Sequence, residues 1–206
     1  VFSHAAAHTE DLVYLGLSGA LSGTLAAGIR AGAEAAKKEG LAFHAVDTRS
    51  GSIGTALIAR RCALAAAEGA SGAEVAALAE ELRSRLGLRF AVRSLDRLIR
   101  SGRLSRTAGL ALNGLGVRPV LTVGEDGKIA KEGLFIGPRR VAAVLEKAVA
   151  GACAASGRIE DLAVTHVGER EAAGRLAEVL AARFNPERPV LVVDLSPAIS
   201  VHVGKG

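Results

Sequence analysis

The chain has 206 residues, 50% of them hydrophobic, so it can bury one large core or two modest ones, and a disordered chain is excluded. Its formal net charge of +5 raises two alternatives, a nucleic-acid surface or a solvated basic face with an anion site. The second is favoured, because only 3% of the residues are aromatic and proteins that bind single strands stack bases on aromatic rings.

In the first half, strand-like apolar runs alternate with helical patterns. The expected strands are residues 12–17 and 42–47, and the expected helices are residues 25–38, 55–67 and 71–86. Ser71 and Glu74 have the spacing of a capping box, and Gly40 and Gly69 are typical of helix ends. This alternation predicts parallel strands joined by crossover helices.

From residue 89 onward the pattern changes, which predicts a domain boundary near residue 90. Strands are expected at residues 90–92, 118–123, 128–136, 162–167 and 190–194, and a last short strand is expected in the apolar run that ends at Val203. Helices are expected at residues 94–100, 169–184 and from Pro138, which suits a first helical turn, to about Ala155. Between two strand-like runs, Gly124-Glu125-Asp126-Gly127 predicts a hairpin turn, because Asp-Gly readily takes positive φ angles.

These elements predict an α/β protein with two α/β domains. Residues 1–90 would hold a parallel sheet with crossover helices, and residues 91–206 a second sheet that contains the hairpin. Cys62 and Cys153 stand far apart in apolar helical patterns, which predicts core thiols in a cytoplasmic protein rather than a metal site or a disulfide. No apolar run approaches the ~20 residues of a membrane helix, so no integral membrane segment is expected.

The most informative feature is a turn rich in glycine and hydroxyl groups, which lies between the first expected strand and the first expected helix. It reads Ser18-Gly19-Ala20-Leu21-Ser22-Gly23-Thr24, and we call it the serine turn. Helix N-termini bind anions, because their first amides lack intrahelical partners and the helix dipole is positive there. The turn lacks both the lysine of a Walker loop and the three spaced glycines of a dinucleotide site. It therefore predicts a site for a small anion such as a carboxylate.

Six short motifs occur in an order that resembles the DegV family of bacterial fatty-acid-binding proteins. They are Leu-Ser-Gly-Ala-Leu-Ser-Gly-Thr (17–24), Val-Asp-Thr-Arg-Ser-Gly-Ser-Ile-Gly (46–54), Ser-Gly-Arg-Leu-Ser (101–105), Val-Arg-Pro-Val-Leu (117–121), Gly-Lys-Ile (127–129) and His-Val-Gly-Lys-Gly (202–206). The chain departs from the family at Gly19, where a second serine is usual. The opening segment of the family is also missing, so the first domain is expected to be N-terminally incomplete relative to the family.

The resemblance implies a carrier rather than an enzyme. One long-chain fatty acid would lie buried in the second domain, and a partner kinase that handles ATP would convert its carboxylate to an acyl phosphate. The resemblance implies no catalytic residue, no metal, no cofactor other than the fatty acid and no nucleic acid. The ligand-binding residues that it implies are Ser18, Gly19, Ser22, Gly23, Thr24, Arg103 and His202. Candidate walls for the acyl chain are residues 110–115, 120–121 and 134–136, and Arg139 and Arg140 would face the kinase.

Each of these residues also has an ordinary structural interpretation. Ser22 and Thr24 precede a helix and are suited to capping it. Arg103 lies at a helix end, where it would bind exposed carbonyl groups. His202 is suited to a place in the core, and apolar residues at the spacing of the candidate walls are ordinary core residues.

Two other functions stay open. An acyl hydrolase would use Ser18 or Ser22 as nucleophile, His202 as base and Asp47 or Asp194 to orient the base. The sequence argues against it, because neither serine stands in a Gly-x-Ser-x-Gly elbow. A DNA-binding regulator is motivated only by the basic charge.

Overall fold

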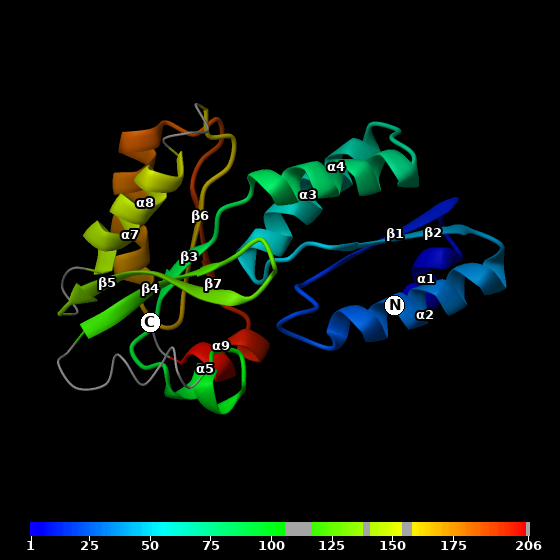
Figure 1. Cartoon of the computed structure of the whole chain (residues 1–206). Coiled ribbons are helices and arrows are strands. Elements are labelled where there is room, and N and C mark those ends of the chain that lie inside the picture. Colours follow the sequence, from blue (N-terminus) through cyan, green and yellow to red (C-terminus); the bar gives the residue numbers. More distant parts are fainter. Residues whose placement is uncertain (106–116, 138–140, 154–157, 205–206) are drawn as a thin grey trace. The chain divides into compact units, whose positions relative to one another are not determined.

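A computed structural model describes residues 1–105, 117–137, 141–153 and 158–204 (Figure 1). The chain divides into two compact units, and each is described by itself. Unit 1 comprises Val1–Leu86 and Gly124–Lys128, and unit 2 comprises Gly87–Val123 and Ile129–Gly206. The domains expected from the sequence, residues 1–90 and 91–206, remain a prediction.

Unit 1 is built on a parallel pair of strands with helices on both faces. Its elements are α1 (Phe2–Ala6), β1 (Asp11–Gly16), α2 (Thr24–Glu39), β2 (Ala42–Asp47), α3 (Ile53–Ala67) and α4 (Gly72–Arg85). β1 and β2 pair in register from Asp11 with Ala42 to Gly16 with Asp47, and α2 connects them as the predicted crossover helix. Figure 1 shows α1 and α2 on one face of this pair and α3 and α4 on the other.

The core of unit 1 lies between β2 and the helices α3 and α4. Its buried residues are Val46, Ile58, Cys62, Val75 and Ala79. α4 begins with the capping box expected from the sequence: Ser71 Oγ accepts from the Glu74 amide, and Glu74 Oε2 accepts from the Ser71 amide at 2.8 Å. Gly40 ends α2 with φ of 72°, a left-handed conformation that glycine adopts at little cost.

Unit 2 holds an antiparallel sheet and a separate parallel pair of strands. Its elements are β3 (Arg89–Ala91), α5 (Asp96–Arg100), β4 (Val117–Val123), β5 (Ile129–Ile136), α7 (Val141–Cys153), β6 (Ala163–His166), α8 (Arg170–Phe184), β7 (Leu191–Asp194) and α9 (Pro197–Val203). The antiparallel sheet has the order β3-β4-β5, and β6 pairs with β7 in parallel. α8 is the crossover between β6 and β7, and it lies beside α7 (Figure 1).

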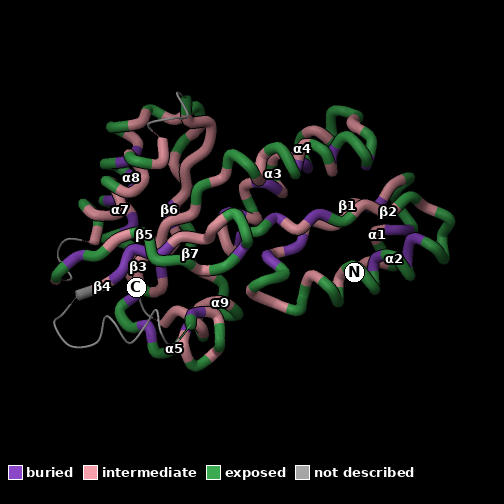
Figure 2. Tube along the Cα trace, viewed as in Figure 1, coloured by how far each residue is buried: buried purple, intermediate pink, exposed green. Residues whose placement is uncertain are grey.

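Two clusters of buried residues stabilise unit 2. Figure 2 marks the buried residues in purple along the chain trace. One cluster joins α5 to the sheet through Val92, Leu95, Leu98, Leu104 and Leu121. The other joins α8 to β6 through Val164, Ala173, Leu176, Ala177 and Leu180. The first cluster matters for function because the partly buried Val203 of α9 packs against it, which fixes α9 next to α5.

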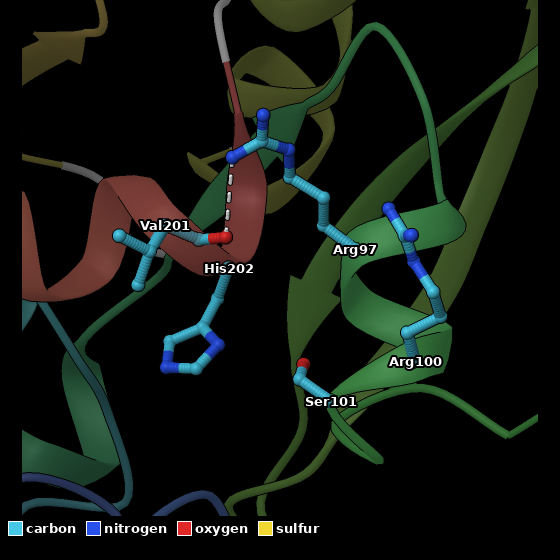
Figure 3. A pocket seen from close by; sticks show the side chains of 5 residues that line it. All are labelled: Arg97, Arg100, Ser101, Val201 and His202. Carbon is cyan, nitrogen blue, oxygen red and sulfur yellow. Dashed lines mark hydrogen bonds between the residues drawn. The ribbon is translucent and has the colours of Figure 1, made fainter.

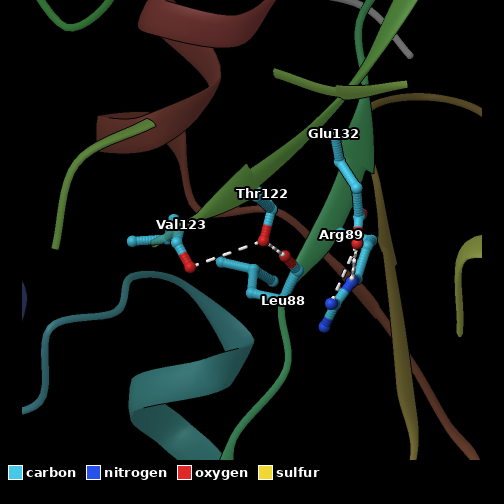
Figure 4. Close-up of polar contacts among 5 residues, drawn as sticks. All are labelled: Leu88, Arg89, Thr122, Val123 and Glu132. Atoms are coloured by element: carbon cyan, nitrogen blue, oxygen red, sulfur yellow. Dashed lines mark hydrogen bonds and ion pairs between the residues drawn. The ribbon is translucent and has the colours of Figure 1, made fainter. Parts of the chain in front are cut away.

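The hairpin β4–β5 forms where the sequence predicts it. Gly127 takes φ of 75° in the turn, and the Gly127 amide donates to Gly124 O at 2.9 Å. In β5 the register shifts opposite Val120 and Leu121, so Glu132 is an extra residue between the paired positions Lys131 and Gly133. Bulges of this kind re-aim side chains. Here the Glu132 carboxylate reaches Arg89 of β3, with Oε1 3.0 Å from Nη2 and Oε2 3.1 Å from Nε (Figure 4).

Two parts of the chain differ from the expected elements. The last apolar run is the helix α9 rather than a strand. Pro197 occupies the first turn of α9, where the missing proline amide has no intrahelical partner to lose. Val201 of this helix is 60% exposed, so its side chain is not buried against a sheet. The short helix α1 lacks a sequence signal. The expected helix start at Pro138 and the candidate wall at residues 110–115 lie outside the described residues, as do Arg139 and Arg140.

Within the described ranges, no helix combines the length and apolar character needed to cross a membrane. Nor do three or more histidine, cysteine, aspartate or glutamate side chains gather there in a way that would hold a metal ion. Both cysteines are free thiols: Cys62 is buried in the core of unit 1, whereas Cys153, at the end of α7, is only half-buried. The expectation of a core thiol is therefore confirmed for Cys62 alone.

Candidate functional site

In unit 1, two loops meet at the carboxyl ends of β1 and β2. Because the strands are parallel, the serine turn after β1 and residues 48–52 after β2 leave the sheet at the same edge. A backbone hydrogen bond joins these loops, from the Ser18 amide to Ser50 O at 2.7 Å, and the Thr48 amide donates to O of Gly16, the last residue of β1, at 3.0 Å. This is the edge at which open α/β sheets bind ligands.

Ser18 is fully buried in the serine turn and its hydroxyl is already engaged. Its Oγ donates to Gly127 O at 2.7 Å and accepts from the Ala20 amide at 3.3 Å. A serine hydroxyl has only one proton to donate. With that proton directed to Gly127, Ser18 fixes the tip of the hairpin against the serine turn within unit 1.

Ser22 and Thr24 lie at the start of α2, on the accessible side of the serine turn. Their hydroxyl oxygens are 2.9 Å apart, and Ser22 Oγ also accepts from the Thr24 amide at 3.2 Å. Two hydroxyls that share one hydrogen bond retain one further proton. The pair can therefore donate to an anion at the positive end of α2, while Ser22 Oγ also accepts from the first amide of that helix.

Asp47, at the end of β2, holds both loops together. Its Oδ1 accepts from the Arg49 amide at 2.8 Å, and its Oδ2 accepts from the Gly19 amide at 3.2 Å. The Gly19 amide, which the sequence offers to a ligand, thus has an internal acceptor. From the sequence, Asp47 is a candidate only for the orienting residue of a hydrolase. In the structure, its carboxylate accepts the Gly19 amide and so helps to fix the conformation of the serine turn.

The loop after β2 contains strained backbone and a buried hydroxyl. Arg49 and Ser52 have φ of 45° and 54°, a region that residues other than glycine rarely adopt. Ser50 is 2% exposed, and among the described residues its Oγ has no hydrogen-bond partner. Gly54 lies against this hydroxyl, because a Cβ at position 54 would come within 2.3 Å of Ser50 Oγ. Position 54 therefore favours glycine, because even the Cβ of alanine would have to displace the Ser50 hydroxyl.

In unit 2, the two remaining predicted site residues lie in the region where α5 and α9 pack together. Arg103 follows α5, and its Nη1 donates to Ser101 O at 2.6 Å, while its amide donates to Leu98 O at 3.0 Å. Arg103 thus binds the carbonyl groups at the end of α5, as its ordinary structural interpretation predicts. His202 is half-buried in the last turn of α9.

A pocket with a volume of ≈ 310 Å³ opens between α5 and α9 (Figure 3). It is lined by Arg97, Arg100, Ser101, Val201 and His202. Figure 3 shows the arginines projecting from α5 and His202 from α9, with the Arg97 guanidinium reaching the Val201 carbonyl. The structure thus brings His202 together with two arginines that the sequence did not single out.

The entire chain, residues 1–206, matches a family model described as "Uncharacterised protein, DegV family". The chain belongs to the DegV family. A DegV domain-containing protein of Mycobacterium bovis is 34% identical over 198 residues, which cover 96% of this chain and 68% of that protein. The resemblance found in the sequence motifs is therefore confirmed.

Solved structures of DegV proteins have the same fold. A DegV protein of Thermus thermophilus, described as fatty acid binding, has 30% identity and a TM-score of 0.83, covering 100% of this chain and 71% of that one. The Fatty Acid Kinase (Fak) B3 protein of Streptococcus pneumoniae, solved loaded with linoleic acid, has 18% identity and a TM-score of 0.85, covering 100% of this chain and 72% of that one. The predicted two-domain α/β fold of the DegV family is confirmed.

Against this family background, the structure separates the predicted site residues into two groups. The serine turn of unit 1 holds five of them together, namely Ser18, Gly19, Ser22, Gly23 and Thr24. Arg103 and His202 belong to unit 2. Sequence reasoning missed Ser50, which lies in the second motif, and considered Asp47 of the same motif only for a hydrolase. It also missed Arg97 and Arg100, whose spacing of three places them on one face of a helix.

Proposed function

We propose that this chain binds one long-chain fatty acid and carries it, in the cytoplasm, to a partner kinase that phosphorylates the carboxylate. The observation that carries this proposal is the likeness along the whole chain, at 30% identity and a TM-score of 0.83, to a Thermus thermophilus DegV protein described as fatty acid binding. The name of the Streptococcus pneumoniae relative, a Fatty Acid Kinase B3 protein, supports a kinase as the partner.

The serine turn supplies hydrogen-bond donors for the carboxylate. The Ser22–Thr24 pair retains a hydroxyl proton beside the positive end of α2, with Gly23 between them giving close access to the backbone. In unit 2, Arg103 and His202 supply cationic or donor groups. Ser18 and Gly19 act indirectly, because their polar groups hold the turn in shape through Gly127 and Asp47.

The acyl chain needs apolar walls, since each buried methylene contributes about 0.8 kcal/mol. Of the candidate walls, Val120 and Leu121 are 2% and 1% exposed in the core of unit 2. Phe135 is also buried, whereas Leu134 and Ile136 on the same strand are 51% and 64% exposed. Val120, Leu121 and Phe135 are therefore the described wall candidates that are buried.

The hydroxyl contacts favour a carrier over a serine hydrolase. A nucleophilic serine needs an imidazole or equivalent base within hydrogen-bond reach. Ser18 instead donates to Gly127 O, and Ser22 bonds to Thr24. The orienting role considered for Asp47 is also filled otherwise, because its carboxylate accepts two backbone amides.

The ligand is identified by mass spectrometry of an organic extract from the purified protein. We expect one long-chain fatty acid per chain. Ser22→Ala, Arg103→Ala and His202→Ala should each retain less acid, by about tenfold for loss of one charge-assisted contact. Ser84→Ala removes an exposed hydroxyl of α4 and is the matched control. Full retention in all three variants would mean that the carboxylate binds elsewhere.

The carrier role is tested by adding a bacterial fatty acid kinase subunit and ATP to the loaded protein. Acyl phosphate is trapped with hydroxylamine as the hydroxamate. We expect hydroxamate only when both proteins are present. Ester hydrolysis by this chain alone, lost in Ser22→Ala, would instead identify an acyl hydrolase.

A further inference from the structure

We propose that the pocket between α5 and α9 binds a phosphate-type dianion attached to an apolar chain. The identification of that group as the phosphoryl end of an acyl phosphate rests on the proposed function. The pocket itself is defined by residues of unit 2 alone: Arg97, Arg100, Ser101, Val201 and His202.

The first support is that, among the described residues, no carboxylate neutralises the two arginines of the pocket. Eight other arginines of the described chain are each paired with a carboxylate, namely Arg83, Arg85, Arg89, Arg93, Arg158, Arg175, Arg183 and Arg188. Within the described ranges, Arg97 and Arg100 have no such partner. Arg97 Nη1 reaches Val201 O, and Arg100 Nε reaches Asp96 O, both at 3.4 Å, a long and weak hydrogen bond. Most of their donor groups are therefore free to bind a ligand.

The second support is the chemistry that these side chains share. A guanidinium group presents two parallel N–H donors that match the oxygens of a phosphate, and two such groups on adjacent turns balance a double negative charge. His202 adds a ring that, in the described part of the protein, makes no hydrogen bond of its own. Figure 3 shows this ring and the Ser101 hydroxyl at the same opening. A carboxylate carries one charge and two oxygens, so it would use only part of this donor set.

The third support is the size and lining of the pocket. Its volume of ≈ 310 Å³ lies at the lower end of the ~300–1,000 Å³ found for small-molecule sites. This leaves room for more than a free phosphate ion. Val201 is 60% exposed at the rim and presents an apolar surface to whatever is attached to the phosphate. Among the described residues, no Phe, Tyr or Trp lines the pocket, and the small imidazole of His202 is its one ring, so the lining suits a lipid-linked phosphate better than a nucleotide base.

A purely structural role for the arginines makes a different prediction. Arg97 lies against the last turn of α9, where a cation offsets the partial negative charge of the helix end. If that were its whole role, replacing the two arginines would lower stability and would not distinguish phosphate from carboxylate. The experiment therefore compares two ligands that differ only in their head group.

Calorimetric titration of the full chain with monododecyl phosphate and with dodecanoate, both below their micelle concentrations, tests the proposal. We expect the parent protein to prefer the phosphate. In Arg97→Ala/Arg100→Ala the ratio of the two affinities should fall by at least about tenfold, the effect of one lost charge-assisted contact. Arg97→Lys/Arg100→Lys should give an intermediate ratio, because lysine keeps the charge and loses the bidentate geometry. Arg158→Ala/Arg175→Ala removes the same charge from exposed sites of unit 2 and is the control.

A third probe, inorganic phosphate followed by ³¹P line broadening, separates failure of this proposal from failure of the proposed function. If the parent binds dodecanoate and the ratio is the same in all variants, the pocket proposal is wrong and the carrier function stands. If the parent binds neither lipid, but phosphate broadening is lost only in Arg97→Ala/Arg100→Ala, the pocket stands as a phosphate site and the carrier function fails. Thermal unfolding of each variant shows that a loss of binding is not a loss of fold.

Discussion

The hydroxyl of Ser18 donates a hydrogen bond of 2.7 Å to the carbonyl oxygen of Gly127, a residue 109 positions later in the chain. A second contact supports it, since Arg49 Nη1 donates to Glu125 O at 3.1 Å. Both acceptors belong to the tip of the β4–β5 hairpin, which is part of unit 1. The serine turn is thus held in place by a turn from the second half of the chain.

Ser18→Ala should therefore act on stability before it acts on binding. It leaves the buried Gly127 carbonyl without its partner and also removes the part-buried acceptor of the Ala20 amide. We expect the free energy of unfolding, measured in urea, to fall by about 1–3 kcal/mol. Ser22→Ala, at a half-buried position, should cost less than about 1 kcal/mol and should show its main effect in lipid retention. The reverse pattern in the two variants would make Ser18 the ligand contact.

Gly127→Ala should be strongly destabilising for two separate reasons. Its φ of 75° costs an alanine about 1–2 kcal/mol, and the new Cβ would lie 2.4 Å from Ser18 Oγ. Gly40→Ala is the matched control, because Gly40 has φ of 72° and no neighbouring atom within 4 Å of a Cβ. Gly127→Ala should cost more than Gly40→Ala, and the excess should shrink in a Ser18→Ala background. If Gly127→Ala still costs as much more than Gly40→Ala when the Ser18 hydroxyl is absent, the added Cβ does not clash with Ser18 Oγ.

The sequence predicts those features of unit 1 that depend on neighbouring residues. The strands β1 and β2, the capping box at Ser71 and the left-handed Gly40 each follow from a local pattern. The partner of Ser18 does not, because no periodicity encodes which carbonyl will lie 2.7 Å from a hydroxyl 109 residues away. The sequence therefore predicts the serine turn as a site but does not predict that the Ser18 hydroxyl bonds to Gly127.

The pocket of unit 2 shows the same limit. His202 is recognised from its motif, but Arg97 contacts Val201 across 104 residues, through the packing of two short helices. The local pattern also fails for α9, since seven apolar-rich residues are too few to separate a strand from a helix. Pro197 after Ser196 is the signal that favours a helix there.

Ser52→Gly should stabilise the protein. Ser52 has φ of 54° and ψ of −131° at the start of α3, and its side chain makes no capping hydrogen bond. Glycine adopts this conformation without the strain of about 1–3 kcal/mol that a Cβ brings, although it adds some backbone entropy to the unfolded chain. We expect a net gain of about 1 kcal/mol in the free energy of unfolding. Ser84→Gly, in the last turn of α4, should instead lower the free energy of unfolding. If both variants lower it equally, backbone strain at Ser52 does not affect stability.

Glu74 should give α4 a stability that depends on pH. Hydrogen bonds from the Ser71 hydroxyl and the Ser71 amide hold the pKa of the Glu74 carboxyl below its ordinary value of 4.5. A pKa that is lower in the folded state adds stability above the ordinary pKa, and this stability is lost as the pH falls through the folded-state pKa. Glu74→Gln should therefore lower the urea midpoint at neutral pH, and its difference from the parent should vanish in acid. Glu80→Gln, on the same helix, is the control and should show a flatter difference between pH values.

The ion pair between Arg89 and Glu132 offers a test of the bulge in β5. The two side chains are 18% and 31% exposed and meet through a bidentate contact across the middle strand β4 (Figure 4). Exposed pairs contribute about 0–1 kcal/mol, and bidentate, partly buried ones lie at the upper end of that range. A double-mutant cycle with Arg89→Met and Glu132→Gln should give a coupling of about 1 kcal/mol. The pair Arg175–Glu171, 3.7 Å apart with side chains 70% and 93% exposed, should give a much smaller coupling. If both cycles give the same small coupling energy, the bulge does not serve to aim Glu132 at Arg89. The reason is that an ion pair whose carboxylate is held in place by the register shift must be coupled more strongly than an exposed pair on a helix surface.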